Sequence, residues 1–179
     1  MSGRWHRGSA ATGGAITRRY RAAGCRRTWR GRTWRGRTWC HRYATARWIG
    51  FLDADDLWFP DKLATAAATL AAAPRAEWFF SDGAFRTLDG VLHASWLSSY
   101  ADLPERYAGH PVAGLLEVNF VLTSSVIVRR ERLAALGGFD ETLSHAEDVD
   151  LWIRLARTVP AAAARRALVR YQHRAGGLT

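Results

Sequence analysis

Short apolar runs and amphipathic segments alternate along the chain from residue 47 onward. The apolar runs span only a few residues and end in polar or turn residues, which predicts buried strands. The amphipathic segments repeat their apolar positions every three or four residues, which predicts helices. The expected strands are 48–53, 77–81, 120–128 and 167–171, with a hairpin at 85–92; the expected helices are 60–73, 112–118, 130–136 and one that begins at 144. Strands that alternate with helices predict an α/β domain.

Three of these helices carry end signals. Pro60 suits the first turn of a helix whose apolar positions are Leu63, Ala67 and Leu70. The pair Gly137-Gly138 closes the third helix, and the polar stretch 98–110 is expected to be a loop. Ser144 and Glu147 fit a capping box at the start of the last helix. The expected buried face of that helix is Val149, Trp152, Leu155 and Ala156.

The N-terminal segment has a different character, which divides the chain into a leader, 1–46, and a domain, 47–179. Residues 1–47 hold 13 Arg and no acidic residue, whereas residues 48–179 hold 13 basic and 16 acidic residues. Arg27 to Trp39 repeats a five-residue unit and has neither a helical nor a strand period. We therefore predict no regular secondary structure for the leader.

Several function classes are disfavoured by composition. The chain has no run of 18 apolar residues, so a membrane span is not expected, and the basic N-terminus has no apolar stretch like that of a signal peptide. The two cysteines, Cys25 and Cys40, form neither a disulfide framework nor a zinc pattern. A reducing cytoplasm is the expected compartment.

Three carboxylates follow the first expected strand: Asp53, Asp55 and Asp56. Carboxylates at this spacing repel one another unless they are solvated or share a divalent cation, and Mg²⁺ takes one or two carboxylates together with substrate phosphates. The end of a strand is also where open α/β sheets bind ligands. The alternative is a solvated turn in which Asp56 caps the next helix.

The flanks of this cluster favour the metal site. The segment FLDADDLWFPDKL, residues 51–63, resembles the metal-binding segment of family 2 glycosyltransferases, which have the GT-A fold. The resemblance implies a GT-A-like mixed sheet flanked by helices. It also implies that Asp55 binds Mn²⁺ or Mg²⁺ and that Asp53 contacts the nucleotide-sugar. Asp56 is expected only to shape the turn.

A second acidic stretch, GGFDETLSHAEDVDLWIRL at 137–155, resembles the same family. The resemblance implies that Asp148 is the catalytic base for the acceptor hydroxyl and that Glu147 lies beside it in the acceptor site. The helix dipole would favour the ionised form of a carboxylate in this first turn. Arg154 is expected either in a surface ion pair or at a phosphate.

Two further segments look like the family. The segment at 119–133 looks like the strand that borders the acceptor pocket in the family. The hydroxyls of Thr123, Ser124 and Ser125 either hydrogen-bond a sugar there or are only structural, and Ser124 is the predicted sugar contact. In the tail after Tyr171, His173 is either a structural residue or a further metal or diphosphate ligand. The chain has no Q-x-x-R-W pattern of processive synthases, which favours a single transfer.

The resemblance implies an inverting transfer of a sugar from a nucleotide donor to a sugar or lipid-linked acceptor. Cell-envelope polysaccharide synthesis is the expected setting, in the cytoplasm or at the inner face of the membrane. The first βαβ unit of such enzymes has no counterpart in residues 1–47. A frame-shifted N-terminal half is the first explanation, and an inactive remnant is the second. The third is a basic Arg/Trp tail that binds nucleic acid or an anionic membrane.

Overall fold

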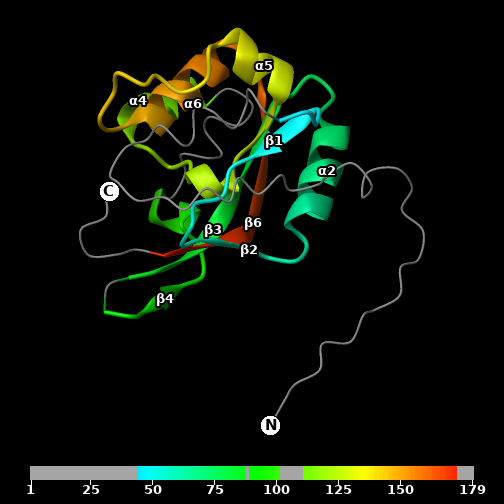
Figure 1. Ribbon diagram of the computed structural model, residues 1–179. Coiled ribbons are helices and arrows are strands. Elements are labelled where there is room, and N and C mark those ends of the chain that lie inside the picture. Colours follow the sequence, from blue (N-terminus) through cyan, green and yellow to red (C-terminus); the bar gives the residue numbers. More distant parts are fainter. Residues whose placement is uncertain (1–43, 88, 101–110, 173–179) are drawn as a thin grey trace.

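The strand β3 (Trp78–Arg86) lies in the middle of the sheet (Figure 1). The computed structural model describes residues 44–87, 89–100 and 111–172. The six strands of these residues form one sheet in the order β1-β5-β3-β6-β2, with β4 paired to β3. The strand β6 (Ala161–Gln172) runs parallel to β3, and the other pairs are antiparallel. The remaining strands are β1 (Trp48–Gly50), β2 (Leu57–Trp58), β4 (Leu92–His93) and β5 (Ile127–Arg129).

Helices cover both faces of the sheet, so the predicted α/β class is confirmed (Figure 1). One face carries α4 (Val112–Glu117), α5 (Arg130–Ala135) and α6 (Glu147–Thr158), and the other carries α2 (Lys62–Ala72). Successive side chains of a strand point to opposite faces. Trp78 therefore stacks on Trp152 of α6 with ring centroids 6.2 Å apart, whereas Phe79 packs toward α2. Within the described residues, no helix is long and apolar enough to cross a membrane.

The observed strands differ in length from the expected ones. The expected strand 120–128 is mostly wrong: Thr123–Ser125 form a 3₁₀ turn, η2, and only Ile127–Arg129 pair as β5. The final strand is longer than expected because β6 begins at Ala161 and includes the alanine run, whose weak strand propensity hid it. The hairpin at Asp89-Gly90 is confirmed, with Gly90 at a φ of 87° and Phe85 opposite His93.

The helix starts show two corrections. The helix α2 begins at Lys62 with Asp61 as its N-cap, and its buried residues are Lys62 and Ala66, one position before the face that was expected. The capping box is wrong. Ala146, in a left-handed conformation with a φ of 57°, is the N-cap of α6, and no side chain caps the helix. Ser144 turns to His145 instead. The glycine closure of α5 is confirmed, because Gly137 and Gly138 both have positive φ.

A buried carboxylate, Asp82, joins the middle of β3 to the segment after β4. Its Oδ1 accepts the backbone N–H groups of Gly83, Trp96 and Leu97 at 2.7 to 2.9 Å. Its Oδ2 accepts the Ser95 hydroxyl at 2.5 Å, and the residue is 3% exposed. Asp82 therefore holds the short helix η1 (Leu97–Tyr100) and the Trp96 ring against the sheet.

Replacement of Asp82 by Ala should lower the free energy of unfolding by about 3 kcal/mol or more, because buried N–H donors lose a charged acceptor. Urea unfolding checks this value. Asp89→Ala, which removes an exposed carboxylate from the nearby turn, is the control and should change stability by less than about 0.5 kcal/mol. Equal losses in the two variants would contradict the role assigned to Asp82.

Candidate functional site

The η2 turn holds the acidic loop that follows β1. Ser124 is 1% exposed, and its Oγ accepts the backbone N–H of Asp53 at 3.0 Å. Its carbonyl accepts the indole N–H of Trp58 at 2.7 Å. One buried residue thus fixes both ends of the loop between β1 and β2. The predicted contact of Ser124 with a sugar stays a prediction, and its observed contacts position the loop.

Within this loop the three carboxylates have different surroundings. Asp55 is exposed and Asp53 is half-buried, whereas Asp56 is 4% exposed and accepts the N–H of Gln172 at 3.0 Å. Burial raises the pKa of Asp56 above its usual range, the hydrogen bonds from Ser124 and Gln172 oppose this, and the charges of Asp53 and Asp55 add to it. Asp56 therefore ties the loop to β6, as expected of a residue that shapes the turn. It does not cap α2.

The Trp58 ring lies against Gly50 at the end of β1 while its N–H reaches the Ser124 carbonyl. A Cβ atom added to Gly50 would lie 2.6 Å from the ring carbon Cη2 of Trp58. Glycine is therefore required at the end of β1 for the indole to reach the Ser124 carbonyl. The sequence pattern does not predict the contact between Gly50 and Trp58. It depends on the η2 turn, whose Ser124 carbonyl positions the indole.

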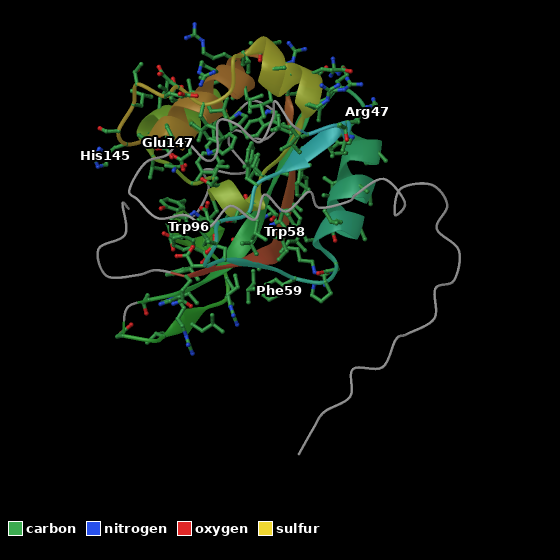
Figure 2. All side chains as sticks on the ribbon, in the orientation of Figure 1. Arg47, Trp58, Phe59, Trp96, His145 and Glu147 are labelled. Carbon is green, nitrogen blue, oxygen red and sulfur yellow. The ribbon has the colours of Figure 1, made fainter. Side chains whose placement is uncertain are left out.

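The same η2 turn contacts the second acidic stretch. Thr123 donates its hydroxyl to Asp148 Oδ2 at 2.8 Å, and the N–H of Val149 donates to Asp148 Oδ1 at 2.8 Å. Asp148 is half-buried at the start of α6. Glu147, which precedes it and is labelled in Figure 2, is 4% exposed. Neighbouring residues of one turn therefore hold Asp53 and Asp148, which are far apart in the sequence.

The start of α6 is strained at Ala146, because an L residue in the left-handed region costs about 1 to 2 kcal/mol. Such strain is found where the surrounding structure imposes it, often at functional sites. Here the strained residue directly precedes Glu147 and Asp148. This is consistent with a helix start whose position is fixed by its carboxylates rather than by a side-chain cap.

Arg154 has an intramolecular role. Its guanidinium pairs with Asp150 at 2.6 Å and donates to the carbonyls of Leu136 and Gly138. Of the two expectations for Arg154, the ion pair is confirmed, and the same side chain holds the glycine turn that ends α5. Trp152 and Leu155 are fully buried, as expected.

The acidic loop has the donor types that Mn²⁺ and Mg²⁺ use. Among the residues described, no three His, Cys, Asp or Glu side chains gather as a metal-binding group. Mg²⁺ usually takes one or two carboxylates and completes its shell with water and substrate phosphates. The exposed Asp55 and half-buried Asp53 fit that smaller donor set, so Asp55 as the metal ligand and Asp53 as the nucleotide-sugar contact stay predictions.

Beneath η2 lies the only lysine of the chain, Lys62. Its side chain is 1% exposed, and its Nζ donates to Ser81 Oγ at 3.0 Å and to the carbonyl of Ser125. Nζ also lies 4.8 Å from the centre of the Phe79 ring. Burial lowers the pKa of Lys62 from 10.5 to about 7. The sequence gives one indication that Lys62 is unusual: it is the single lysine of the chain, and it lies at a helix start within the motif at 51–63.

The stability of the fold should depend on pH through Lys62. The unfolded chain binds this proton up to a pKa of 10.5 and the folded chain only to about 7, so the penalty is complete below pH 7 and is relieved as pH rises toward 10.5. Between pH 7.5 and 9.5 the unfolding free energy should rise relative to Lys62→Met by on the order of 1 kcal/mol per pH unit. Urea unfolding at three pH values measures it, and parallel pH curves would contradict the assignment.

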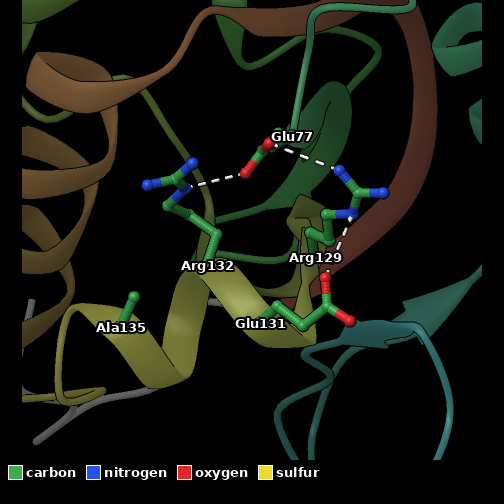
Figure 3. A pocket seen from close by; sticks show the side chains of 5 residues that line it. All are labelled: Glu77, Arg129, Glu131, Arg132 and Ala135. Carbon is green, nitrogen blue, oxygen red and sulfur yellow. Dashed lines mark hydrogen bonds and ion pairs between the residues drawn. The ribbon is translucent and has the colours of Figure 1, made fainter.

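A separate polar cavity lies at the other end of β5 (Figure 3). It has a volume of about 180 Å³ and is lined by Glu77, Arg129, Glu131, Arg132 and Ala135. Glu77 Oε2 accepts Arg132 Nε at 2.7 Å, and this bond is the main reason that the pKa of Glu77 lies below its usual range. The arginines are thus paired within the protein, and the cavity lies away from Asp53 and Asp148.

Comparison with protein families identifies the chain. The model described as "Glycosyltransferase like family 2" matches residues 75–179, and the model "Glycosyl transferase family 2" matches residues 9–112. Each match covers more than half of the chain. The chain belongs to glycosyltransferase family 2. The second match begins inside the basic leader. The division at residue 46 and the frame-shift hypothesis stay predictions. Residues 1–43 of the leader and His173 lie outside the described residues.

Solved structures show the fold of this glycosyltransferase family 2 chain. S. aureus TarS residues 1–349 in complex with UDP matches with a TM-score of 0.57 and 18% identity over 78% of this chain and 39% of that one. TarS 1–349 in a second crystal structure matches with a TM-score of 0.55 and 18% identity over 74% and 37%. The chain spans about two fifths of those structures, and the predicted GT-A-like fold is confirmed. No curated protein sequence matches.

Proposed function

We propose that this chain transfers a sugar from a nucleotide-diphosphate donor to an acceptor hydroxyl. The observation that carries the proposal is the η2 turn, which holds Asp53 through Ser124 and Asp148 through Thr123. The carboxylate proposed to bind the donor and the carboxylate proposed as the base are thus both hydrogen-bonded to one short, buried segment. Such fixed geometry is what a displacement between two bound reactants needs.

In the proposed reaction, Asp53 and Asp55 bind the diphosphate end of the donor, with Asp55 as the ligand of Mn²⁺ or Mg²⁺. When bound, this ion supplies positive charge that stabilises the leaving nucleoside diphosphate. The half-buried Asp148 accepts the proton of the attacking hydroxyl through the oxygen that Thr123 orients. One base on the acceptor side implies attack opposite the leaving group and inversion at the anomeric carbon.

The donor class is suggested by the TarS structure that resembles this chain, which is a complex with UDP. A UDP-sugar is therefore the first donor to test. We propose a sugar or lipid-linked acceptor, a single transfer per encounter, and a place at the inner membrane surface. Glu147, next to the proposed base, would lie on the acceptor side. Its burial favours a role in shaping that side over direct contact with bulk solvent.

The test is release of nucleoside diphosphate from a panel of UDP-, GDP- and dTDP-sugars with Mn²⁺, with and without lipid-linked and free sugar acceptors. We expect acceptor-dependent release from one donor class and loss of release with a chelator. The competing proposal is an inactive remnant. It would be favoured if a folded chain binds a nucleotide with Mn²⁺ yet releases no product from any donor.

A further inference from the structure

We propose that Lys62 is a positioning residue for the reaction: its buried amine holds the η2 turn in the place where that turn carries Asp53 and Asp148. The catalytic meaning of this inference rests on the proposed function. Its structural content, that Lys62 fixes the turn, can be tested without any substrate.

The Lys62 amine bridges two segments of the fold. Nζ donates to the carbonyl of Ser125 and to the hydroxyl of Ser81 on β3, so it joins η2 to the middle of the sheet. The Ser125 hydroxyl itself is buried and, in the described part of the chain, has no hydrogen-bond partner. The hydrogen-bonded link from this residue to β3 therefore runs from its carbonyl through Lys62 to Ser81.

The η2 turn contacts both acidic segments through its other residues. Ser124 accepts the Asp53 N–H and the Trp58 indole N–H, and Thr123 donates to Asp148. A three-residue turn has little stability of its own, since 3₁₀ geometry makes weak hydrogen bonds. A shift of the Ser125 carbonyl would therefore move both acidic groups together.

Burial of the Lys62 amine has an energetic cost. A buried ammonium group is destabilising unless its contacts compensate, and an apolar side chain of similar size often gives a more stable protein. The low pKa of Lys62 shows that its contacts, a hydroxyl, a carbonyl and a ring face, compensate only in part. Because Lys62 lowers stability at this position, we explain its presence by the η2 turn that it holds in place.

The experiment compares Lys62→Met with Leu70→Ala, a packing change on the same helix within the cluster around Ala66 and Leu168. Hydrogen exchange of the Asp53 amide and the NMR resonance of the Trp58 indole N–H report the turn directly. Lys62→Met should speed exchange at Asp53 by about tenfold and move the Trp58 resonance, while Leu70→Ala leaves both unchanged although it lowers stability. Because these readouts need no substrate, they hold even if no sugar nucleotide is turned over.

If the chain is active, Lys62→Met should lower kcat by about 10- to 100-fold, as misplaced reacting groups do, with the donor KM changed less than about threefold. Should Lys62→Met fail to fold, Ser81→Ala removes one partner of the amine and should shift the same two protons in the same direction by a smaller amount. The inference is overturned if the Asp53 and Trp58 protons are unchanged in the variant that folds. It is also overturned if they change equally in Leu70→Ala.

Discussion

Asp148→Asn should lower kcat by about 10²- to 10⁴-fold, the range that positioned proton transfer contributes. Asparagine keeps the shape of the side chain, and its one oxygen can still accept the N–H of Val149 while the Thr123 hydroxyl turns to accept from the new amide. It cannot take a proton from the acceptor. The Asp53 and Asp55 end of the site is untouched, so the affinity for the nucleotide donor should be retained. Steady-state release of nucleoside diphosphate and calorimetric donor titration measure the two quantities.

The matched control is Asp150→Asn, two residues along the same helix turn. Asp150 pairs with Arg154, so its loss should lower stability while kcat stays within about threefold of the wild type. An active Asp148→Asn enzyme would remove Asp148 as the base. A loss of activity that is equal in the two variants would point to the fold of α6 instead.

Asp55→Ala should abolish metal-dependent donor binding. Loss even of groups that only support a metal ligand costs about 10- to 100-fold in metal affinity, and loss of the ligand should cost at least as much. Because Asp55 is exposed, its removal should leave the free energy of unfolding within about 0.5 kcal/mol of the wild type. Titration of a nucleoside diphosphate in the presence of Mn²⁺, with and without a chelator, measures the effect.

The control for this variant is Asp140→Ala, which removes an exposed carboxylate from the segment before α6. It should leave Mn²⁺-dependent binding unchanged. Donor binding by Asp55→Ala that equals the wild type and still requires Mn²⁺ would place the ion on other residues. Wild-type binding that is insensitive to the chelator would remove the metal from the proposal.

The sequence predicted the elements that border the site because their signals are local. The apolar run before Asp53, the helix after Pro60 and the glycines that close α5 each combine a short pattern with a residue of restricted or unusual backbone preference. The two acidic stretches could also be predicted from the sequence. Ligands bind at the carboxyl ends of strands, and the helix dipole favours carboxylates in the first helical turn.

What the sequence did not predict depends on contacts between distant segments. The residues of η2 lie in an apolar run that looks like one strand, and only the tertiary contacts of Thr123 and Ser124 bend it into a turn. The helix α6 begins after Ala146, whose backbone is in the left-handed conformation, and not after the expected Ser144 cap. The sequence pattern does not predict a left-handed alanine. The burial of Lys62 likewise runs against the usual exposure of lysine.

The measurement that tests the site most directly is the paramagnetic effect of Mn²⁺ on the ¹⁵N-labelled protein in the presence of UDP or GDP. The ion should broaden the Trp58 indole resonance and the amides of 53–56 and 123–125, with a weaker effect at Glu77 and Arg132 at the other end of β5. The same addition to Asp55→Ala should leave these resonances sharp. Broadening that centres on the Arg129 to Arg132 cavity, or that persists in Asp55→Ala, would contradict the placement of the donor site.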